Sequence, residues 1–257
     1  MAITPIIEPT TSLKNARIGY KNLLVTSDLA TADKMLIPNT YERYISGSGT
    51  YTIRFQLSEI STIDFVAIGA HNAGTHNSGT DILVRYATSI GGALTTIENL
   101  TFADNSAKMI LFNEITAAEI ALVFTTTAAG LELGVLYAGK ALEMERPIYG
   151  GHSPINLSAK TKYESVMSES GNFLGRTIKS QGVETGFSWQ HLSPNWYRQN
   201  FQPFVLSSKT IPFFIMWRPE LYSDSVFGFT TKDIAPVNMS GGSGLMSVSI
   251  NVMGHSE

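Results

Sequence analysis

Apolar and polar residues alternate along the first half of the chain at the spacing of β-strands. In residues 51–58, Ile53, Phe55 and Leu57 are apolar and the residues between them are polar. Because successive side chains of a strand point to opposite faces, this segment predicts a strand with one buried and one solvated face. Residues 65–68 are all apolar instead, which predicts a strand that is covered on both faces.

Several more short apolar segments follow at regular spacing. Gly91 and Gly92 lie between two of them and supply the backbone freedom of a tight hairpin turn. Between two later segments, 109–112 and 120–124, we expect a polar turn. Short, regularly spaced strands favour an antiparallel β-sandwich over a parallel βαβ fold. The strands predicted in this region are 81–86, 94–97, 109–112, 120–124 and 131–137.

The second half of the chain predicts further strands and one short helix. Residues 211–217 form the most apolar segment, typical of a buried strand, and residues 246–252 are apolar at every second position. Ser193 followed by Pro194 is a helix-start signal. Pro203 limits this helix to about two turns before a kink.

A change in composition divides the chain. Residues 143–154 are rich in proline, glycine and charge, which is typical of a domain boundary and places one near Arg146. The first residues contain two prolines and few apolar side chains, so they are expected to form an arm. We therefore predict an N-terminal arm at 1–16, a β-sandwich at 17–145 and a second β-rich domain at 146–257.

Composition and charge narrow the functional classes. Charged residues make up only 15% of the chain, below the roughly 25% of typical soluble proteins, so uncharged polar residues must form much of a surface that is suited to protein contacts. The net charge is −3 and no basic cluster stands out, so direct nucleic-acid binding is not expected. The chain has no cysteine, which excludes disulfides, thiolate metal sites and a cysteine nucleophile. With no secretory signal and no apolar run long enough for a membrane span, we expect it to mature in the cytoplasm.

Catalytic signatures are missing from the sequence. We find no nucleophile elbow, zinc-protease helix, phosphate-binding loop or dinucleotide fingerprint, and therefore predict that the protein is not an enzyme and uses no cofactor. Glu143 and Glu145 form a close acidic pair, as a glycan hydrolase would need. Glycosidases hold their two carboxylates on different elements, so a solvated linker is the favoured interpretation of this pair.

One loop contains the candidate contact residues. His71, Asn72, His76 and Asn77 lie in a stretch rich in Gly, Asn and Ser that follows an apolar strand, and loops at the end of a sandwich often form binding sites. Two histidines in one loop can share a metal ion. No third ligand stands at a regular spacing, so we predict no metal site and favour a role in structuring the loop.

Aromatic residues are concentrated in the second half of the chain. Exposed, they would form a sugar platform or a protein interface, because aromatic side chains provide large contact area at low entropic cost. The favoured interpretation is a core built around the short helix and the 213–217 strand. The residues concerned are Trp189, Trp196, Tyr197, Phe201, Phe204, Phe213, Phe214, Trp217 and Tyr222.

Residues 63–72, 81–86, the Gly91–Gly92 turn and the strand that ends at 135–139 together resemble the discoidin-like, or galactose-binding-like, jelly roll. The resemblance covers about residues 17–140. It implies that the predicted sandwich is a jelly roll. The spanning disulfide of lectin-type discoidin domains is impossible here, and the sugar-contacting loop residues have no match.

The continuation of the chain is similar to tail structural proteins of long-tailed bacteriophages. The similarity rests on residues 144–154, 168–176 and 212–219. It implies a virion protein of the distal tail or baseplate, assembled in the host cytoplasm, that forms a homo-oligomeric ring and contacts other tail proteins such as the tube and the hub. No catalytic residues come with this family.

These patterns lead to one fold prediction and two functional hypotheses. The fold is all-β, with a jelly-roll β-sandwich followed by a second β-rich, ring-forming domain that has one short helix. The first hypothesis is a non-enzymatic structural protein of a phage tail. The alternative is a carbohydrate-binding adhesin module that contacts a glycan on the host surface through the loop of His71, Asn72, His76 and Asn77.

Overall fold

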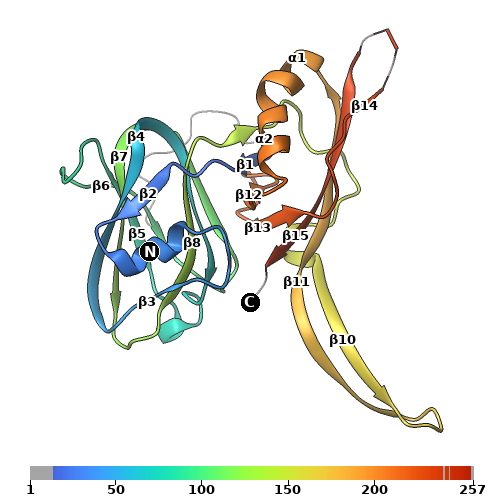
Figure 1. Cartoon of the computed structure of the whole chain (residues 1–257), viewed down its shortest axis with the longest axis horizontal. Helices are drawn as coiled ribbons and strands as arrows, with labels where there is room; N and C mark the ends of the chain where they lie inside the picture. Colours follow the sequence, from blue (N-terminus) through green and yellow to red (C-terminus); the bar gives the residue numbers. More distant parts are fainter. Residues whose placement is uncertain (1–13, 240, 243, 256–257) are drawn as a thin grey trace.

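The computed structural model describes residues 14–239, 241–242 and 244–255 and contains two sheets that lie side by side (Figure 1). Strands dominate and the helices are short, which confirms the all-β prediction. The predicted arm at 1–16 lies outside the described residues up to residue 13. Within the described residues, no helix is long and apolar enough to cross a membrane.

A seven-stranded sheet that folds over on itself forms a jelly-roll-like β-sandwich. The first half of β4 pairs with β2 and with the second half of β7. The second half of β4 pairs with β8 and with the first half of β7. The long strands β4 and β7 thus pass from one layer of the sandwich to the other. The core lies between the two layers. The strands are β2 (Leu24–Ser27), β3 (Tyr44–Ile45), β4 (Gly49–His71), β5 (Ile82–Ala87), β6 (Thr95–Leu100), β7 (Lys108–Thr126) and β8 (Glu132–Gly139), with 3-10 helices η1 (Ala30–Leu36) and η2 (His76–Ser78).

Strand β7 replaces two predicted strands. Residues 109–112 and 120–124 belong to one continuous strand, so the polar turn expected between them is wrong. Within this stretch, Ile115 and Thr116 pair with Ile63 and Thr62 of β4. Pairing to a neighbouring strand therefore overrides the local turn signal.

The burial of β4 confirms both patterns read from its sequence. Ile53, Phe55 and Leu57 are buried in the sandwich core, as the alternation predicts. In the apolar run 65–68, Val66 and Ile68 face the same core, whereas Phe65 and Ala67 face the second sheet. The run is continuously apolar because each of its faces meets a different apolar layer.

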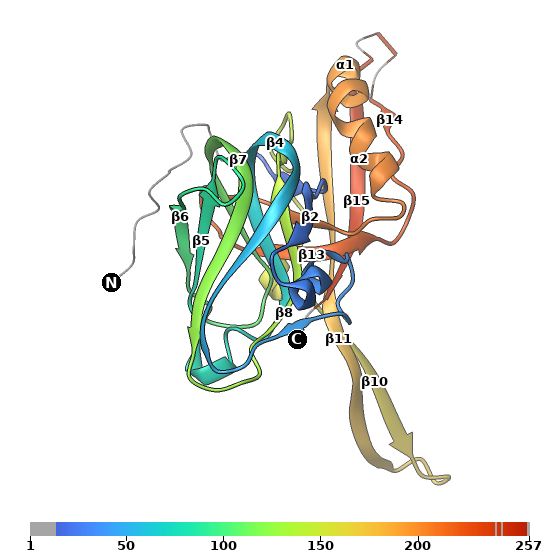
Figure 2. The same ribbon diagram turned by 60° about the vertical axis from the view of Figure 1, so that its left-hand side comes forward.

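The second sheet has eight strands in the order β10-β11-β15-β13-β12-β1-β9, with β14 paired to β15. Figure 2 shows it as a separate layer beside the sandwich. Strand β12 is buried throughout, and in β15 Val248, Ile250 and Val252 are buried, as predicted. The bounds are β1 (Arg17–Gly19), β9 (Leu142–Glu143), β10 (Ala159–Met167), β11 (Phe173–Leu192), β12 (Phe213–Met216), β13 (Ser225–Thr230), β14 (Val237–Asn238) and β15 (Met246–His255), with η3 (Ile155–Leu157) between β9 and β10.

Strands β1 and β9 lie in this second sheet although they flank the sandwich in sequence. Ile18 pairs with Ile215 of β12 on one side and with Leu142 of β9 on the other. Arg17 adds an ion pair to Glu143, with 3.0 Å between Nη2 and Oε2. The second sheet thus differs from the predicted range 146–257, because it also takes the two short strands that enter and leave the sandwich.

One helical segment covers a face of the second sheet (Figure 1). It consists of α1 (Pro194–Trp196), the π-helical turn η4 (Tyr197–Phe201) and α2 (Gln202–Ser207), and it buries Phe201 and Phe204. The predicted start at Ser193 and Pro194 is confirmed. At η4 the Gln202 N–H donates to Tyr197 O, five residues earlier. The wider turn lies just before Pro203, which lacks an N–H and crowds the preceding turn of a helix.

The two sheets share an apolar interface of their own. It contains Phe65 and Tyr137 of the sandwich together with Phe214 and Phe227 of the second sheet. The Tyr137 hydroxyl donates to Pro212 O at 3.1 Å. Gly69 lies at a close approach of the two sheets, where an added Cβ would meet Phe227 and Phe214 at 3.2 and 3.3 Å. Dense packing of this kind predicts that the two domains unfold together.

Candidate functional site

The loop that contains the predicted contact residues begins at the end of β4. His71 is 0% exposed, and its aromatic ring lies edge-on to that of Phe102, with 4.6 Å between centroids. Its Nε2 lies 3.0 Å from Ser106 O, and its Nδ1 accepts the Ala73 N–H at 3.3 Å. Burial lowers the pKa of His71 to about 4. The imidazole is therefore neutral near pH 7 and holds the loop in place.

Asn72 joins the same loop to the neighbouring strand. Its Nδ2 donates to Gly130 O at 2.9 Å, and its Oδ1 accepts the Glu132 N–H at 2.8 Å. Both ends of the side-chain amide are thereby engaged within the protein. The structure places His71 and Asn72 as internal supports of the loop.

His76 and Asn77 lie in the short helix η2, nearer the surface. His76 Nδ1 is 3.0 Å from Thr80 Oγ1, while its Nε2 is buried and has no partner among the described residues. Asn77 is exposed and adopts a left-handed backbone with φ of 51°, a conformation that asparagine tolerates. These two residues are the ones of the predicted set that remain near solvent.

A second loop completes this end of the sandwich, and its residues were not singled out from the sequence. Asn105 Oδ1 accepts the N–H groups of Gly74 and Thr75 at 3.1 and 3.2 Å. Asp104 accepts hydrogen bonds from the hydroxyl and the N–H of Ser106, and the hydroxyl bond lowers the pKa of Asp104. Asn and Asp after Phe102 were the available signal, since both residues favour turns.

The described residues of this loop do not form a metal-binding site. In the part of the chain that the structure describes, no group of three or more His, Asp or Glu side chains is placed to hold an ion. The nearest carboxylate side chains and the two histidines engage protein partners instead.

The acidic pair Glu143 and Glu145 has two separate structural roles. Glu143 forms the ion pair with Arg17. Glu145 accepts the Ser193 N–H at 2.7 Å and the Ser193 hydroxyl at 2.8 Å. The two carboxylates thus bind strand β1 and the start of the helix, one each.

The aromatic residues of the second half mostly build the core, as the sequence analysis favoured. Tyr222 is exposed, and its ring stacks on that of half-buried Trp217 at 4.9 Å between centroids. Trp196 is half-buried as well. The buried members are Trp189, Tyr197, Phe201, Phe204, Phe213 and Phe214.

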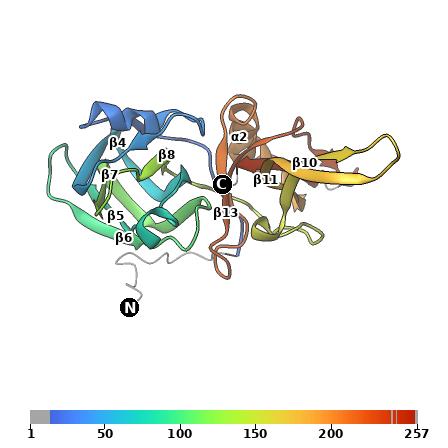
Figure 3. The same cartoon turned by 90° about the horizontal axis from the view of Figure 1, so that it is seen from below.

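The hairpin of β10 and β11 is the largest feature that the sequence analysis missed. Figure 3 shows it extending away from both domains. Strand β10 is the edge of its sheet and is exposed along almost its whole length. Large apolar side chains lie in the open on both strands of the hairpin, between 49% and 65% exposed: Tyr163, Val166 and Met167 on β10, and Phe173, Leu174 and Ile178 on β11.

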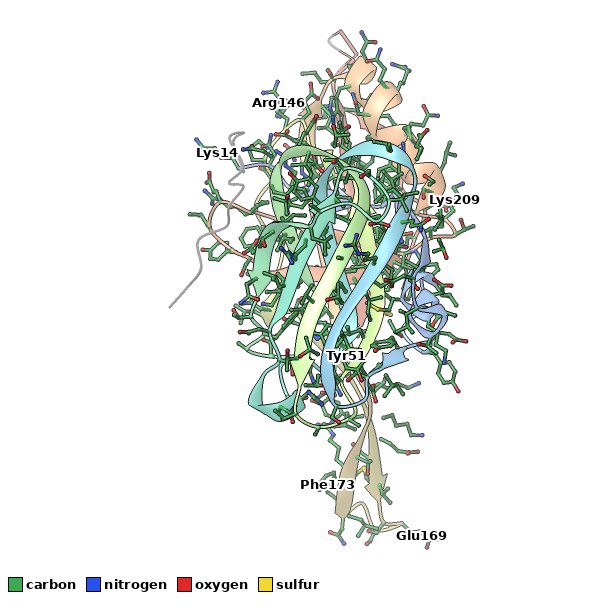
Figure 4. All side chains as sticks on the ribbon, turned by 90° about the vertical axis from the view of Figure 1, so that its left-hand side faces the viewer. Lys14, Tyr51, Arg146, Glu169, Phe173 and Lys209 are labelled. Atoms are coloured by element: carbon green, nitrogen blue, oxygen red, sulfur yellow. The ribbon has the colours of Figure 1, made fainter. Side chains whose placement is uncertain are left out.

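Internal contacts shape the far end of the hairpin. The turn is closed by hydrogen bonds from Ser168 N–H to Asn172 O at 2.8 Å and from Gly171 N–H to Ser168 O at 2.9 Å. Asn172 N–H donates to Ser168 Oγ at 3.0 Å. Figure 4 shows Glu169 and Phe173 at this end, far from the body of the protein. The turn is thus preformed and carries apolar side chains beside it.

Charged residues brace the stem of the hairpin. The Arg176 guanidinium lies 4.1 Å from the centre of the Tyr163 ring, and Lys179 pairs with Glu164 at 2.9 Å. Each of these exposed contacts contributes less than about 1 kcal/mol. Together they favour one extended arrangement of the hairpin over many.

Comparison with known proteins gives structural likenesses only. No protein-family model matches the chain, and no curated protein matches it. A family 32 carbohydrate-binding module from Clostridium perfringens, solved with galactose, is 14% identical with a TM-score of 0.38 and covers 48% of this chain and 98% of its own. A chitosan-binding module from Paenibacillus sp. IK-5 is 18% identical with a TM-score of 0.36, over 49% and 95%. A pectin-binding module is 14% identical with a TM-score of 0.37, over 46% and 91%. TM-scores this low do not assign a ligand to the chain.

Proposed function

We propose that this protein is a non-catalytic structural subunit that joins a larger assembly through the β10–β11 hairpin. The observation that carries the proposal is the group of apolar side chains exposed on both strands of a hairpin that projects from the body and includes the edge strand β10. An open edge with apolar side chains is an aggregation hazard that proteins normally cover. In an assembled subunit, a partner subunit covers this edge and its apolar side chains.

The assembly that fits best is the tail of a long-tailed bacteriophage. In this proposal the chain is a virion protein of the distal tail or baseplate, assembled in the host cytoplasm as a ring of identical copies next to tube and hub proteins. The support is the resemblance carried by residues 144–154, 168–176 and 212–219, of which the second range forms the hairpin turn and the start of β11.

Replacing residues 160–181 by a short Gly-Ser turn tests the role of the hairpin. We expect a folded protein, because the removed residues form no part of the three apolar cores, and complete loss of incorporation into tail particles. Incorporation is measured by quantitative mass spectrometry of particles purified from host cells that supply the variant in place of the wild-type chain.

A matched control changes a different exposed turn of the same protein. Replacing residues 89–92, the turn between β5 and β6, by Gly-Ser residues should leave incorporation unchanged. Incorporation of the hairpin variant at the wild-type level would contradict the proposal, provided that both variants unfold at the same temperature as the wild type.

A second candidate is glycan binding at the loop end of the sandwich. The observation that favours it is the group of exposed polar side chains there, which includes Thr75, Asn77 and Asp104. Hydrogen-bonding groups of this kind are what a sugar hydroxyl requires. A host-surface glycan would be the partner, and the loop would be the contact.

Glycan-array binding of the intact protein tests this second candidate. We expect Asn77→Gly to lower binding at least about 10-fold, because it keeps the left-handed backbone and removes only the amide. Asn238→Gly, at an exposed position of the second sheet, is the matched control and should bind like the wild type. An array on which the wild-type protein binds nothing would eliminate glycan binding and leave the structural proposal untouched.

A further inference from the structure

A largely apolar groove of about 830 Å³ lies at the base of the β10–β11 hairpin. The segment before β3 and the ends of β13 and β15 form its walls, and the start of β10 forms its rim. Phe229 and Tyr163 line it and are each 49% exposed, and Phe229 pairs with Met253 across β13 and β15. Pro38, Pro212 and buried Phe227 complete the apolar lining.

The far end of the same hairpin is a protrusion, whereas its base forms the groove. Met167 and Phe173 pair across it, and Leu174 follows in a register irregularity that turns it outward. We call these three exposed side chains, together with the hydrogen-bonded turn between them, the hairpin tip. Its turn is fixed before any contact forms, so docking it costs little conformational entropy.

The hairpin tip and the rim of the groove also carry opposite charges. Glu169 in the hairpin tip and Lys162 at the groove rim are both exposed. Neither has an ion-pair partner among the described residues, whereas the neighbouring Lys160 pairs with Glu184 at 2.7 Å. A tip placed in a groove would bring an unpaired carboxylate toward an unpaired ammonium group.

We infer that the hairpin tip of one copy docks into the groove of a second copy of this chain. The two surfaces lie at opposite ends of one extended strand, β10, so a tip does not reach its own groove. Every docked copy then has one free tip and one free groove, a head-to-tail contact that repeats until a ring closes. This inference rests on the proposed function, because it names the partner of the hairpin as an identical subunit.

A crosslinking experiment in the cysteine-free chain tests the contact. One population carries Leu174→Cys and the other Phe229→Cys, and because the wild type has no cysteine each chain has a single reactive thiol. On mixing with a short bismaleimide, we expect a crosslinked dimer of unlike chains as the main product. Replacing the second population by Ile90→Cys, an exposed site on the sandwich, should reduce this dimer to the background level.

Sedimentation of surface variants gives an independent measure. The double substitution Phe173→Ser with Leu174→Ser should weaken self-association at least about 30-fold, as expected for central apolar contacts. Leu206→Ser changes an equally exposed leucine on the helix and should have no effect. Glu169→Lys and Lys162→Glu should each weaken association about 3-fold to 5-fold, and a chain with both reversals should regain it.

The outcomes separate this inference from the proposed function. Equal crosslinking to Ile90→Cys, or unchanged sedimentation of the tip variant, would overturn docking between identical copies. If the purified chain stays monomeric and uncrosslinked while the hairpin remains necessary for incorporation into tails, the hairpin partner is another tail protein and only this inference fails. If the hairpin is dispensable for incorporation, the proposed function fails.

Discussion

Replacing Phe214 by alanine should lower the free energy of unfolding by about 3–5 kcal/mol, because a fully buried phenylalanine loses both its apolar burial and its packing. Phe214 is 0% exposed. Its ring lies 5.4 Å from that of Tyr137 in the sandwich and 4.8 Å from that of Phe227 in the second sheet. The cavity would open between the two domains, and urea denaturation of the purified chain would measure the loss.

Phe213→Ala is the matched control for the location of this effect. Phe213 is equally buried, but it points to the opposite face of β12 and packs on Phe204 beneath the helix. The two variants should lose similar stability. In hydrogen exchange, Phe214→Ala should speed the backbone amides of both domains, including 65–68, whereas Phe213→Ala should act mainly within the second sheet.

A small effect would contradict the domain arrangement. A loss below about 1 kcal/mol for Phe214→Ala is typical of an exposed or loosely packed side chain. Unchanged exchange in residues 65–68 would show that the sandwich does not depend on this contact.

The local pattern of apolar residues predicts burial well in strand β4. Alternation at Ile53, Phe55 and Leu57 and the continuous run at 65–68 both follow from the layers they contact. The residues of this run did not show that a second domain covers its outer face. A covered face looks the same in sequence whichever layer covers it.

The domain boundaries could not be predicted from the sequence for a different reason. Strands β1 and β9 contain three and two residues, too few for any periodic signal. Their place in the second sheet depends on pairing between positions far apart in the chain, such as Ile18 with Ile215. Non-local pairing of this kind is decided by tertiary packing, and the composition change near Arg146 marks only the last crossing between domains.

The candidate sites show the same limit. The apolar residues of the hairpin lie on strands that no layer of the chain covers, so a burial pattern does not distinguish the hairpin. The Ser-Glu-Ser-Gly-Asn turn at 168–172 was the one local signal of the hairpin. In the loop after β4, the sequence placed four polar residues together but could not tell supports from contacts. His71 ends a strand of buried residues, and that continuity was the available indication that it points inward.

Acidification should destabilise the protein through His71, by about 3 kcal/mol between pH 7.5 and pH 4. Burial lowers the pKa of His71 in the folded state to about 4, from 6.5 in the unfolded chain. Its contribution to stability is therefore fully present above pH 6.5 and is lost as the pH falls toward 4, because only the unfolded state then takes up the proton. A difference of this size follows from about 1.4 kcal/mol per unit of pKa.

His71→Asn isolates this contribution from the carboxylates that titrate in the same range. Burial raises the pKa of Asp64 and of Glu98, which favours the folded state at low pH and opposes the histidine. Both groups remain in the variant, so the difference between variant and wild type reports His71. We expect the variant to be about 1 kcal/mol less stable at pH 7.5, since it loses the bond to Ser106 O, and more stable than the wild type at pH 4.

His191→Asn provides the control, because this exposed histidine has a left-handed backbone with φ of 61° that asparagine also adopts. Its unfolding free energy, from urea titrations at pH 7.5 and pH 4, should change with pH as that of the wild type does. Parallel pH profiles for His71→Asn and the wild type would mean that the imidazole at position 71 is charged or solvated in the folded protein. The loop after β4 would then be open to ligands at its base, and the division between internal supports and surface contacts would have to be redrawn.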